Sequence, residues 1–134
     1  MEGIQERVPA TKEWVPKLRH AVLGFLPAHH PNATQVAGDV GLAVTEATSN
    51  VVRHAYPGRD RGEIRLDVHL HGDLLVVAVS DDGVGFAHAA DDPGGGFGLR
   101  LIRELAHTQI RSEAGRTRVE MRFPIPQSAV ARDA

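Results

Sequence analysis

The clearest pattern in the chain is a run of apolar residues at helical spacing between residues 32 and 56. These residues recur at intervals of four, four, three and four; they are Val36, Val40, Val44, Ala47 and Val51. Such a stripe is typical of one buried face of an α-helix. Asn32 and Gln35 form the two halves of a capping box before it, and a Pro-Gly pair follows Tyr56. The pattern predicts one long helix with this stripe in the core.

Two shorter elements are expected before this helix. Residues 4–9 read as an edge strand that a proline closes. Apolar residues at helical spacing predict a helix that begins near residues 12–14 and ends at Leu26. A proline-flanked linker is expected next, and its adjacent residues His29 and His30 are expected to be solvated rather than bound to a metal.

Beyond the long helix the apolar period changes from helical to two, which is typical of half-buried strands. The strands are expected over residues 64–70, 74–79, 108–113 and 117–123, and a further helix over residues 99–106. Residues 74–79 are nearly all apolar, so this strand should lie in the middle of the sheet. Helices followed by hairpins predict an α+β fold, a two-layer sandwich with helices packed on one face of a mixed, mostly antiparallel sheet.

Length and composition narrow the class of protein. The 134 residues suit one domain, expected over residues 1–126, with a frayed tail over 127–134. The net charge of −2 argues against a general nucleic-acid or membrane surface. The absence of cysteine excludes disulfides and cysteine-based zinc sites. The start does not resemble a signal peptide and no apolar run could span a bilayer, so we expect a cytoplasmic protein.

A polar stripe lies on the same long helix as the apolar one. Glu46, Asn50 and His54 follow one another at intervals of four, so they share a face of the helix. An Asn oxygen is a hard ligand that suits Mg²⁺, and a Glu one turn earlier could deprotonate an attacking hydroxyl or water. The alternative is an ordinary solvated helix surface. The stripe therefore suggests a hydrated, charged ligand without naming it.

Two glycine-containing segments could supply the rest of a site. One segment, with Asp81, Gly83 and Gly85, follows the central strand. Its carboxylate could accept a hydrogen bond from an exocyclic amine, and its glycines could leave room for a flat ring. The alternative is a simple turn. The run of residues 94–99, Gly-Gly-Gly-Phe-Gly-Leu, precedes a helix, where free backbone N–H groups suit phosphate; a flexible linker is the alternative. It is neither a Walker A loop nor a dinucleotide fingerprint.

Together these three segments strongly resemble the GHKL ATPase superfamily over roughly residues 5–125. The helix stretch is similar to its N-box, residues 81–85 to its G1 box and residues 96–99 to its G2 box. The motif Glu-Ala-x-x-Asn-x-x-x-His-Ala-Tyr at residues 46–56 resembles that of one branch of the superfamily, the bacterial anti-sigma-factor serine-protein kinases. The resemblance implies ATP and Mg²⁺ as cofactors.

The resemblance also implies a role for each matching residue. Asn50 would coordinate Mg²⁺ and Glu46 would be the catalytic base, with Arg53 and His54 near the phosphates. Asp81 would bond the adenine amino group. The remaining residues implied in nucleotide binding are Gly83 and Gly85 in the base pocket, Gly96, Phe97, Gly98 and Leu99 at the phosphates, and Thr117, which would hold adenine through water.

One departure from the branch leaves its activity open. Kinases of this branch can carry an Arg just before the G2 glycines, where this chain has Gly94 and Gly95. The first hypothesis is a serine-protein kinase that phosphorylates an anti-sigma-factor antagonist of the STAS type and sequesters a sigma factor. The second is a non-catalytic, ATP-dependent protein-binding switch, and the third is the catalytic fragment of a sensor histidine kinase. The resemblance also implies that the chain can form a homodimer.

Overall fold

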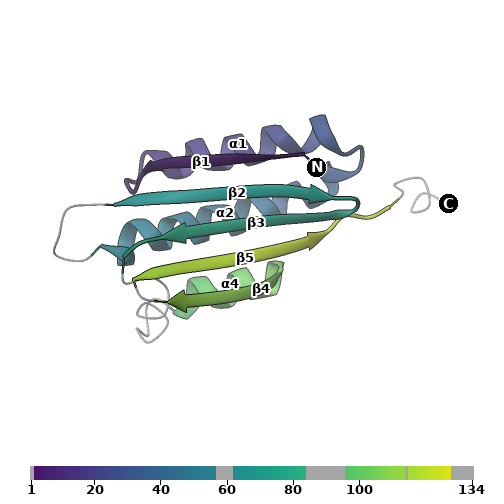
Figure 1. Cartoon of the computed structure of the whole chain (residues 1–134). Helices are drawn as coiled ribbons and strands as arrows, with labels where there is room; N and C mark the ends of the chain where they lie inside the picture. The colour runs from purple at the N-terminus through teal and green to yellow at the C-terminus, as the bar shows by residue number, and fades with distance from the viewer. Residues whose placement is uncertain (1, 57–61, 84–95, 114, 128–134) are drawn as a thin grey trace.

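The structure, a computed structural model, describes residues 2–56, 62–83, 96–113 and 115–127, which form two layers (Figure 1). One layer is an antiparallel sheet in the order β1-β2-β3-β5-β4. Its strands are β1 (Glu2–Pro9), β2 (Glu63–His71), β3 (Leu74–Asp81), β4 (His107–Glu113) and β5 (Arg116–Pro124). The other layer holds α1 (Trp14–His29), η1 (Ala33–Val36), α2 (Ala37–Asn50), η2 (Val51–Ala55) and α4 (Gly96–Leu105). The predicted two-layer α+β fold is confirmed.

The sheet follows the apolar pattern of its strands. In β2 and β5 every second residue is buried, because one face of the sheet packs on the helices. β3 is buried almost throughout and lies between β2 and β5, so its predicted central position is confirmed. All four strand pairings are antiparallel, so the described sheet has none of the parallel pairing that a mixed sheet would contain.

The prediction of one regular helix over residues 32–56 is wrong in detail. The segment begins as the 3₁₀ turn η1, continues as α2 and ends as the π-helical turn η2. Asn32 forms no side-chain cap, and its amide Nδ2 donates to the backbone oxygen of Pro126 at 2.9 Å. The apolar stripe does face the core, where Val40, Val44 and Ala47 are fully buried.

The expected linker after residue 26 is also wrong, because α1 continues through Pro27 to His29. A proline this close to the end removes few helical bonds, and the backbone N–H of His30 still donates to Leu26. The His30 side chain is buried rather than solvated. Its Nδ1 accepts from the N–H of Asn32 at 3.0 Å, so Nε2 must carry the proton and donate to Asp73 at 2.8 Å. His30 thus ties α1 to the β2–β3 hairpin.

The core lies between the sheet and the helices. Leu99 and Ile102 attach α4 to it, and the inward residues Val119, Met121 and Phe123 of β5 are buried, as the alternation predicts. No helix in the described part of the chain combines the length and the apolar character needed to cross a bilayer. The described residues also hold no group of three potential metal ligands among His, Cys, Asp and Glu.

Candidate functional site

The polar stripe lies where α2 gives way to η2. Glu46 and His54 are half-buried, whereas Asn50 is only 3% exposed. The wider turn of η2 directly follows Asn50, and such single π-turns occur frequently at functional sites. Burial distinguishes Asn50 from the solvated surface residue that was its alternative interpretation, because burying an amide costs free energy unless its polar atoms find partners.

The amide of Asn50 is only partly satisfied within the described residues. Its Oδ1 accepts from Nη2 of Arg53 at 2.8 Å. A guanidinium group can only donate, so the atom that faces Arg53 must be the amide oxygen and not the nitrogen. The Nδ2 atom is buried and finds no hydrogen-bond partner in the part of the chain that the structure describes. This amide therefore already binds one cationic group and has a donor left over.

Asp81 and Thr117 meet on neighbouring strands at the opposite side of the site. Asp81 is the last residue of β3, and the β3–β5 register places it directly opposite Thr117. Each is 1% exposed. Oδ1 of Asp81 accepts from the N–H of Gly83 at 2.9 Å, and Oγ1 of Thr117 lies 3.4 Å from Oγ of Ser112. The structure thus brings together two residues that lie far apart in the sequence and that both match adenine-binding positions.

Gly83 packs the exit of β3 against the end of the helix layer. A Cβ atom built on Gly83 would overlap the backbone oxygen of Ala55 in η2 and would also come within 2.9 Å of its side chain. Only glycine permits this approach. Gly83 therefore joins the two halves of the site, a packing role that the sequence did not indicate. Its contact with the adenine base stays a prediction.

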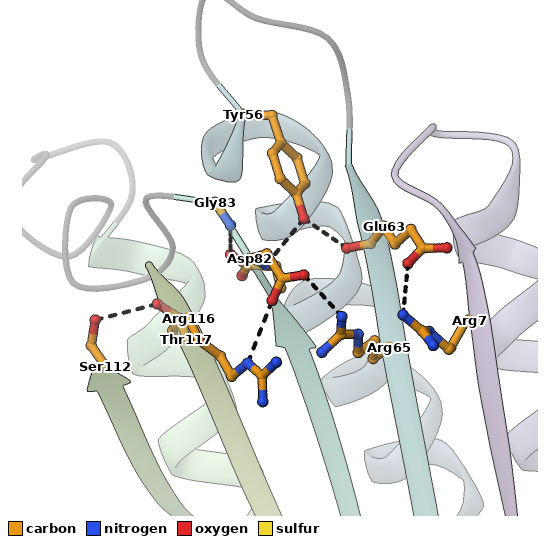
Figure 2. Close-up of polar contacts among 10 residues, drawn as sticks. Arg7, Tyr56, Glu63, Arg65, Asp82, Gly83, Ser112, Arg116 and Thr117 are labelled. Atoms are coloured by element: carbon orange, nitrogen blue, oxygen red, sulfur yellow. Dashed lines mark hydrogen bonds and ion pairs between the residues drawn. The ribbon is translucent and has the colours of Figure 1, made fainter. Parts of the chain in front are cut away.

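Tyr56 makes a second connection between the same two elements, which Figure 2 shows from the strand side. Its hydroxyl donates to the backbone oxygen of Glu63 at 2.8 Å and accepts from the backbone N–H of Asp82 at 3.1 Å. Burial, reinforced by the nearby negative charge of Asp81, raises the pKa of the Tyr56 phenol above its usual value, although the bond from Asp82 opposes the rise. The sequence predicts Tyr56 only as the last residue of the long helix and gives no sign of these two hydrogen bonds.

Asp82 anchors the exit of β3 on the uncovered side of the sheet. Its carboxylate lies 2.9 Å from Nη2 of Arg65 on β2 and 3.4 Å from Nε of Arg116 on β5 (Figure 2). These bonds hold the main chain of Asp82 between its two neighbouring strands. They therefore limit the movement of the adjacent Asp81, which faces the other way along the strand.

The third motif takes a different form from the one expected. The helix was predicted from Leu99 with a glycine loop before it, but α4 already begins at Gly96. Gly96, Phe97 and Gly98 therefore belong to its first turn, whose backbone N–H groups have no partner within the helix. Leu99 is buried in the core. Gly85, Gly94 and Gly95 lie outside the described residues.

Among the described residues, Oδ1 of Asn50 is the candidate ligand for a divalent cation that the sequence predicts. That oxygen suits a hard cation, and its present partner is itself a cation, the guanidinium group of Arg53. Mg²⁺ keeps several waters and takes few protein ligands when it is bound with a nucleotide, so one amide oxygen fits such a site. Arg53 would have to release this oxygen, and its exposed side chain is free to turn toward an anion.

Comparison with known proteins agrees with this geometry. A family model for the histidine kinase-like ATPase domain matches residues 8–123, and the chain belongs to this family. The predicted resemblance to the GHKL superfamily is thereby confirmed. Within the family, the chain is 35% identical over 85 residues to the serine-protein kinase RsbW of Listeria innocua serovar 6a. That alignment covers 63% of this chain and 54% of the relative, so the chain spans about half the length of that kinase.

Solved structures show the same fold. The structure of the RsbU and RsbW domains of Rv1364c from Mycobacterium tuberculosis has a TM-score of 0.74 at 21% identity, covering 96% of this chain and 34% of that one. The SiaB–SiaC complex from Pseudomonas aeruginosa gives a TM-score of 0.65 at 15% identity, covering 90% and 88%. At these identities the likeness establishes the architecture alone.

Adding one methyl group at Gly83 should separate the two halves of the site. We expect Gly83→Ala to lower the free energy of unfolding by about 1–3 kcal/mol, because the new Cβ meets the backbone of Ala55. Gly24→Ala is the matched control, since nothing lies within 4 Å of its Cβ in α1, and it should stabilise the protein by about 1 kcal/mol. Urea denaturation measures both. Equal effects of the two substitutions would contradict the packing role.

Removing the Tyr56 hydroxyl should weaken the same connection in a pH-dependent way. Tyr56→Phe should lower the free energy of unfolding by about 0.5–1.5 kcal/mol near neutral pH. Because the folded-state pKa is raised, the contribution of the hydroxyl is complete below the unfolded-state pKa of about 10 and is lost as the pH rises through the folded-state value. The gap between wild type and variant should therefore narrow in alkaline solution. A gap that is constant with pH would show that the phenol does not titrate differently on folding.

Proposed function

We propose that this protein is an ATP-binding serine-protein kinase that phosphorylates an anti-sigma-factor antagonist and sequesters a sigma factor. The observation that carries the proposal is the buried amide of Asn50, whose oxygen accepts from the guanidinium group of Arg53 at the helix end that packs on the exit of β3. Membership of the histidine kinase-like ATPase family and similarity to a serine-protein kinase support the choice of ligand and reaction.

The proposed ligand is ATP bound with Mg²⁺. Asp81 accepts from the adenine amino group, Thr117 binds the base through water, and Gly83 and Gly85 line the base pocket. The first turn of α4 presents the backbone of Gly96-Phe97-Gly98-Leu99 to the phosphates, where the helix dipole favours negative charge. Mg²⁺, when bound at Asn50, supplies positive charge to the phosphates. Arg53 and His54 then approach the phosphates from η2.

The proposed reaction moves the γ-phosphoryl group to a serine. Glu46 lies one helical turn before Asn50 and accepts the proton of the serine hydroxyl. The serine oxygen forms a bond to the γ-phosphorus while the bond between that phosphorus and the β–γ bridging oxygen breaks, and ADP leaves with the bridging oxygen. The proposed partners are the antagonist, of the STAS type, and the sigma factor, in the cytoplasm; a homodimer completes the assembly.

A second candidate is a non-catalytic, ATP-dependent protein-binding switch. The observation that favours it is the pair Gly94 and Gly95, which stands where kinases of the branch can carry an Arg near the γ-phosphate. Arg100 is exposed on α4, about one turn after the helix begins at Gly96. The switch predicts partner binding that depends on ATP while the mass of the partner stays unchanged.

Changing Glu46 tests the kinase against the switch. Wild type with Mg²⁺ and ATP should add one phosphoryl group to a serine of the cognate antagonist, and Glu46→Gln should slow this by about a hundredfold or more, because the base is lost. ATP affinity should be unchanged. Glu104→Gln, at an exposed position of α4, is the matched control and should transfer at the wild-type rate. Intact-mass spectrometry of the antagonist gives the readout.

No transfer by wild type, with ATP-dependent binding retained, would favour the switch. Undiminished transfer by Glu46→Gln would remove Glu46 from the chemistry. Phosphate on a histidine of the partner, recognised by its acid lability, would point to the histidine-kinase hypothesis instead.

A further inference from the structure

The helices cover one face of the sheet, and no helix or strand in the described part of the chain covers the other, which we call the bare face (Figure 1). Because the inward residues of β5, Thr117, Val119 and Met121, are buried, the residues between them point to the bare face. Arginines gather there although the chain as a whole carries a net charge of −2. They come from four strands and are Arg7, Arg65, Arg111, Arg116, Arg118 and Arg122.

The strand register sets two of these arginines directly against each other. Arg111 of β4 is the partner of Arg118 of β5. Like charges at directly opposed positions destabilise a sheet, because their Cβ atoms are about 5 Å apart. The fold gains nothing from this pair. Arg7 and Arg65 are opposed in the same way at the other edge, but each of them has a carboxylate within 3.2 Å, on Glu63 and Asp82.

The arginines of β4 and β5 are less well compensated. Arg118 and Arg122 share the single carboxylate of Glu120, at 3.8 and 3.1 Å, and Arg118 also lies 3.5 Å from Asp67. Among the described residues, Arg111 forms no ion pair. These side chains surround a hollow of about 270 Å³ lined by Gln109, Arg111, Arg118, Glu120 and Arg122. The lining holds three guanidinium groups and one carboxylate, and Asp67 compensates Arg118 from outside it, so an excess of positive charge remains in the hollow.

We propose that this hollow, which we call the β4–β5 arginine hollow, binds a phosphate group in its dianionic form. The negative charge of the ligand complements the positive excess in the lining, and planar guanidinium groups match phosphate oxygens in pairs. Gln109 adds amide donors. The hollow is smaller than typical nucleotide-sized pockets, and none of its lining residues is aromatic, so a base has nothing to stack on.

This site is separate from the proposed nucleotide site. Asn50 lies in the helix layer, on the opposite face of the sheet from Arg111 and Arg118. The proposal therefore holds whether or not the chain is a kinase. The phosphate can come from two sources, a phosphorylated side chain of a protein or free inorganic phosphate, and both present the same three oxygens.

Arginine side-chain NMR of the whole chain, without nucleotide, tests the proposal. The Nε–Hε signals of Arg111, Arg118 and Arg122 should shift saturably as inorganic phosphate is added at constant ionic strength. Arg111→Gln should weaken phosphate binding by about tenfold or more, because a charge-assisted bond is lost. Arg7→Gln is the matched control: it removes the same charge from the same face, outside the hollow, and should leave the affinity nearly unchanged.

Three results would overturn the proposal. They are the absence of a saturable shift, an equal loss of affinity in Arg7→Gln, and binding of succinate at the same affinity as phosphate. Two peptide probes then distinguish the two sources of phosphate and test the preference for phosphate over carboxylate. A neutral peptide with one phosphoserine should bind more tightly than inorganic phosphate if the natural ligand is a phosphoprotein, and no more tightly if it is free phosphate. The same peptide with glutamate in place of phosphoserine should not bind; equal binding would assign the hollow to carboxylates.

Discussion

The close approach of Gly83 to Ala55 is the contact on which the candidate site depends. The residues that match metal and catalytic positions lie in the helix layer, and those that match base-binding positions lie at the ends of β3 and β5. They become one site only where the exit of β3 rests on η2. Glycine makes the approach possible, and Tyr56, which directly follows η2, reinforces it through hydroxyl bonds to Glu63 of β2 and to Asp82 after β3. The π-turn of η2 places Ala55 and Tyr56 at this junction directly after Asn50.

The site is built from polar groups that the fold buries at a cost. Asn50, Asp81 and Thr117 are each at most 3% exposed, and the Nδ2 atom of Asn50 finds no partner in the described part of the chain. A buried donor without a partner costs about 1–3 kcal/mol. Apolar residues of similar size would give a more stable junction. The choice of polar residues is understandable if a ligand supplies the missing partner of Asn50, since violations of local packing rules tend to concentrate at functional sites.

The sequence predicted the features that depend on neighbouring residues and missed those that depend on residues far away in the chain. The apolar run of β3 and the alternation of β5 are local signals, and both elements lie where the sequence placed them. The prediction of a single helix over residues 32–56 was wrong at its start, where Asn32 forms no cap and its amide instead bonds to Pro126, 94 residues away. The roles of Tyr56 and Gly83 depend equally on distant partners, so no spacing in the sequence could reveal them. The family resemblance identified the three motifs, but it did not show that Arg53 occupies the oxygen of Asn50.

The central claim of the proposed function is that Asn50 binds Mg²⁺ together with ATP. Calorimetric titration with ATP, in Mg²⁺ and again in EDTA, should be carried out on wild type and on Asn50→Ala. We predict that Mg²⁺ tightens ATP binding by wild type and does not tighten it in the variant, while both proteins bind metal-free ATP with similar affinity. Binding in EDTA also shows that the variant is folded. An equal effect of Mg²⁺ on both proteins, or no ATP binding by wild type, would contradict the account.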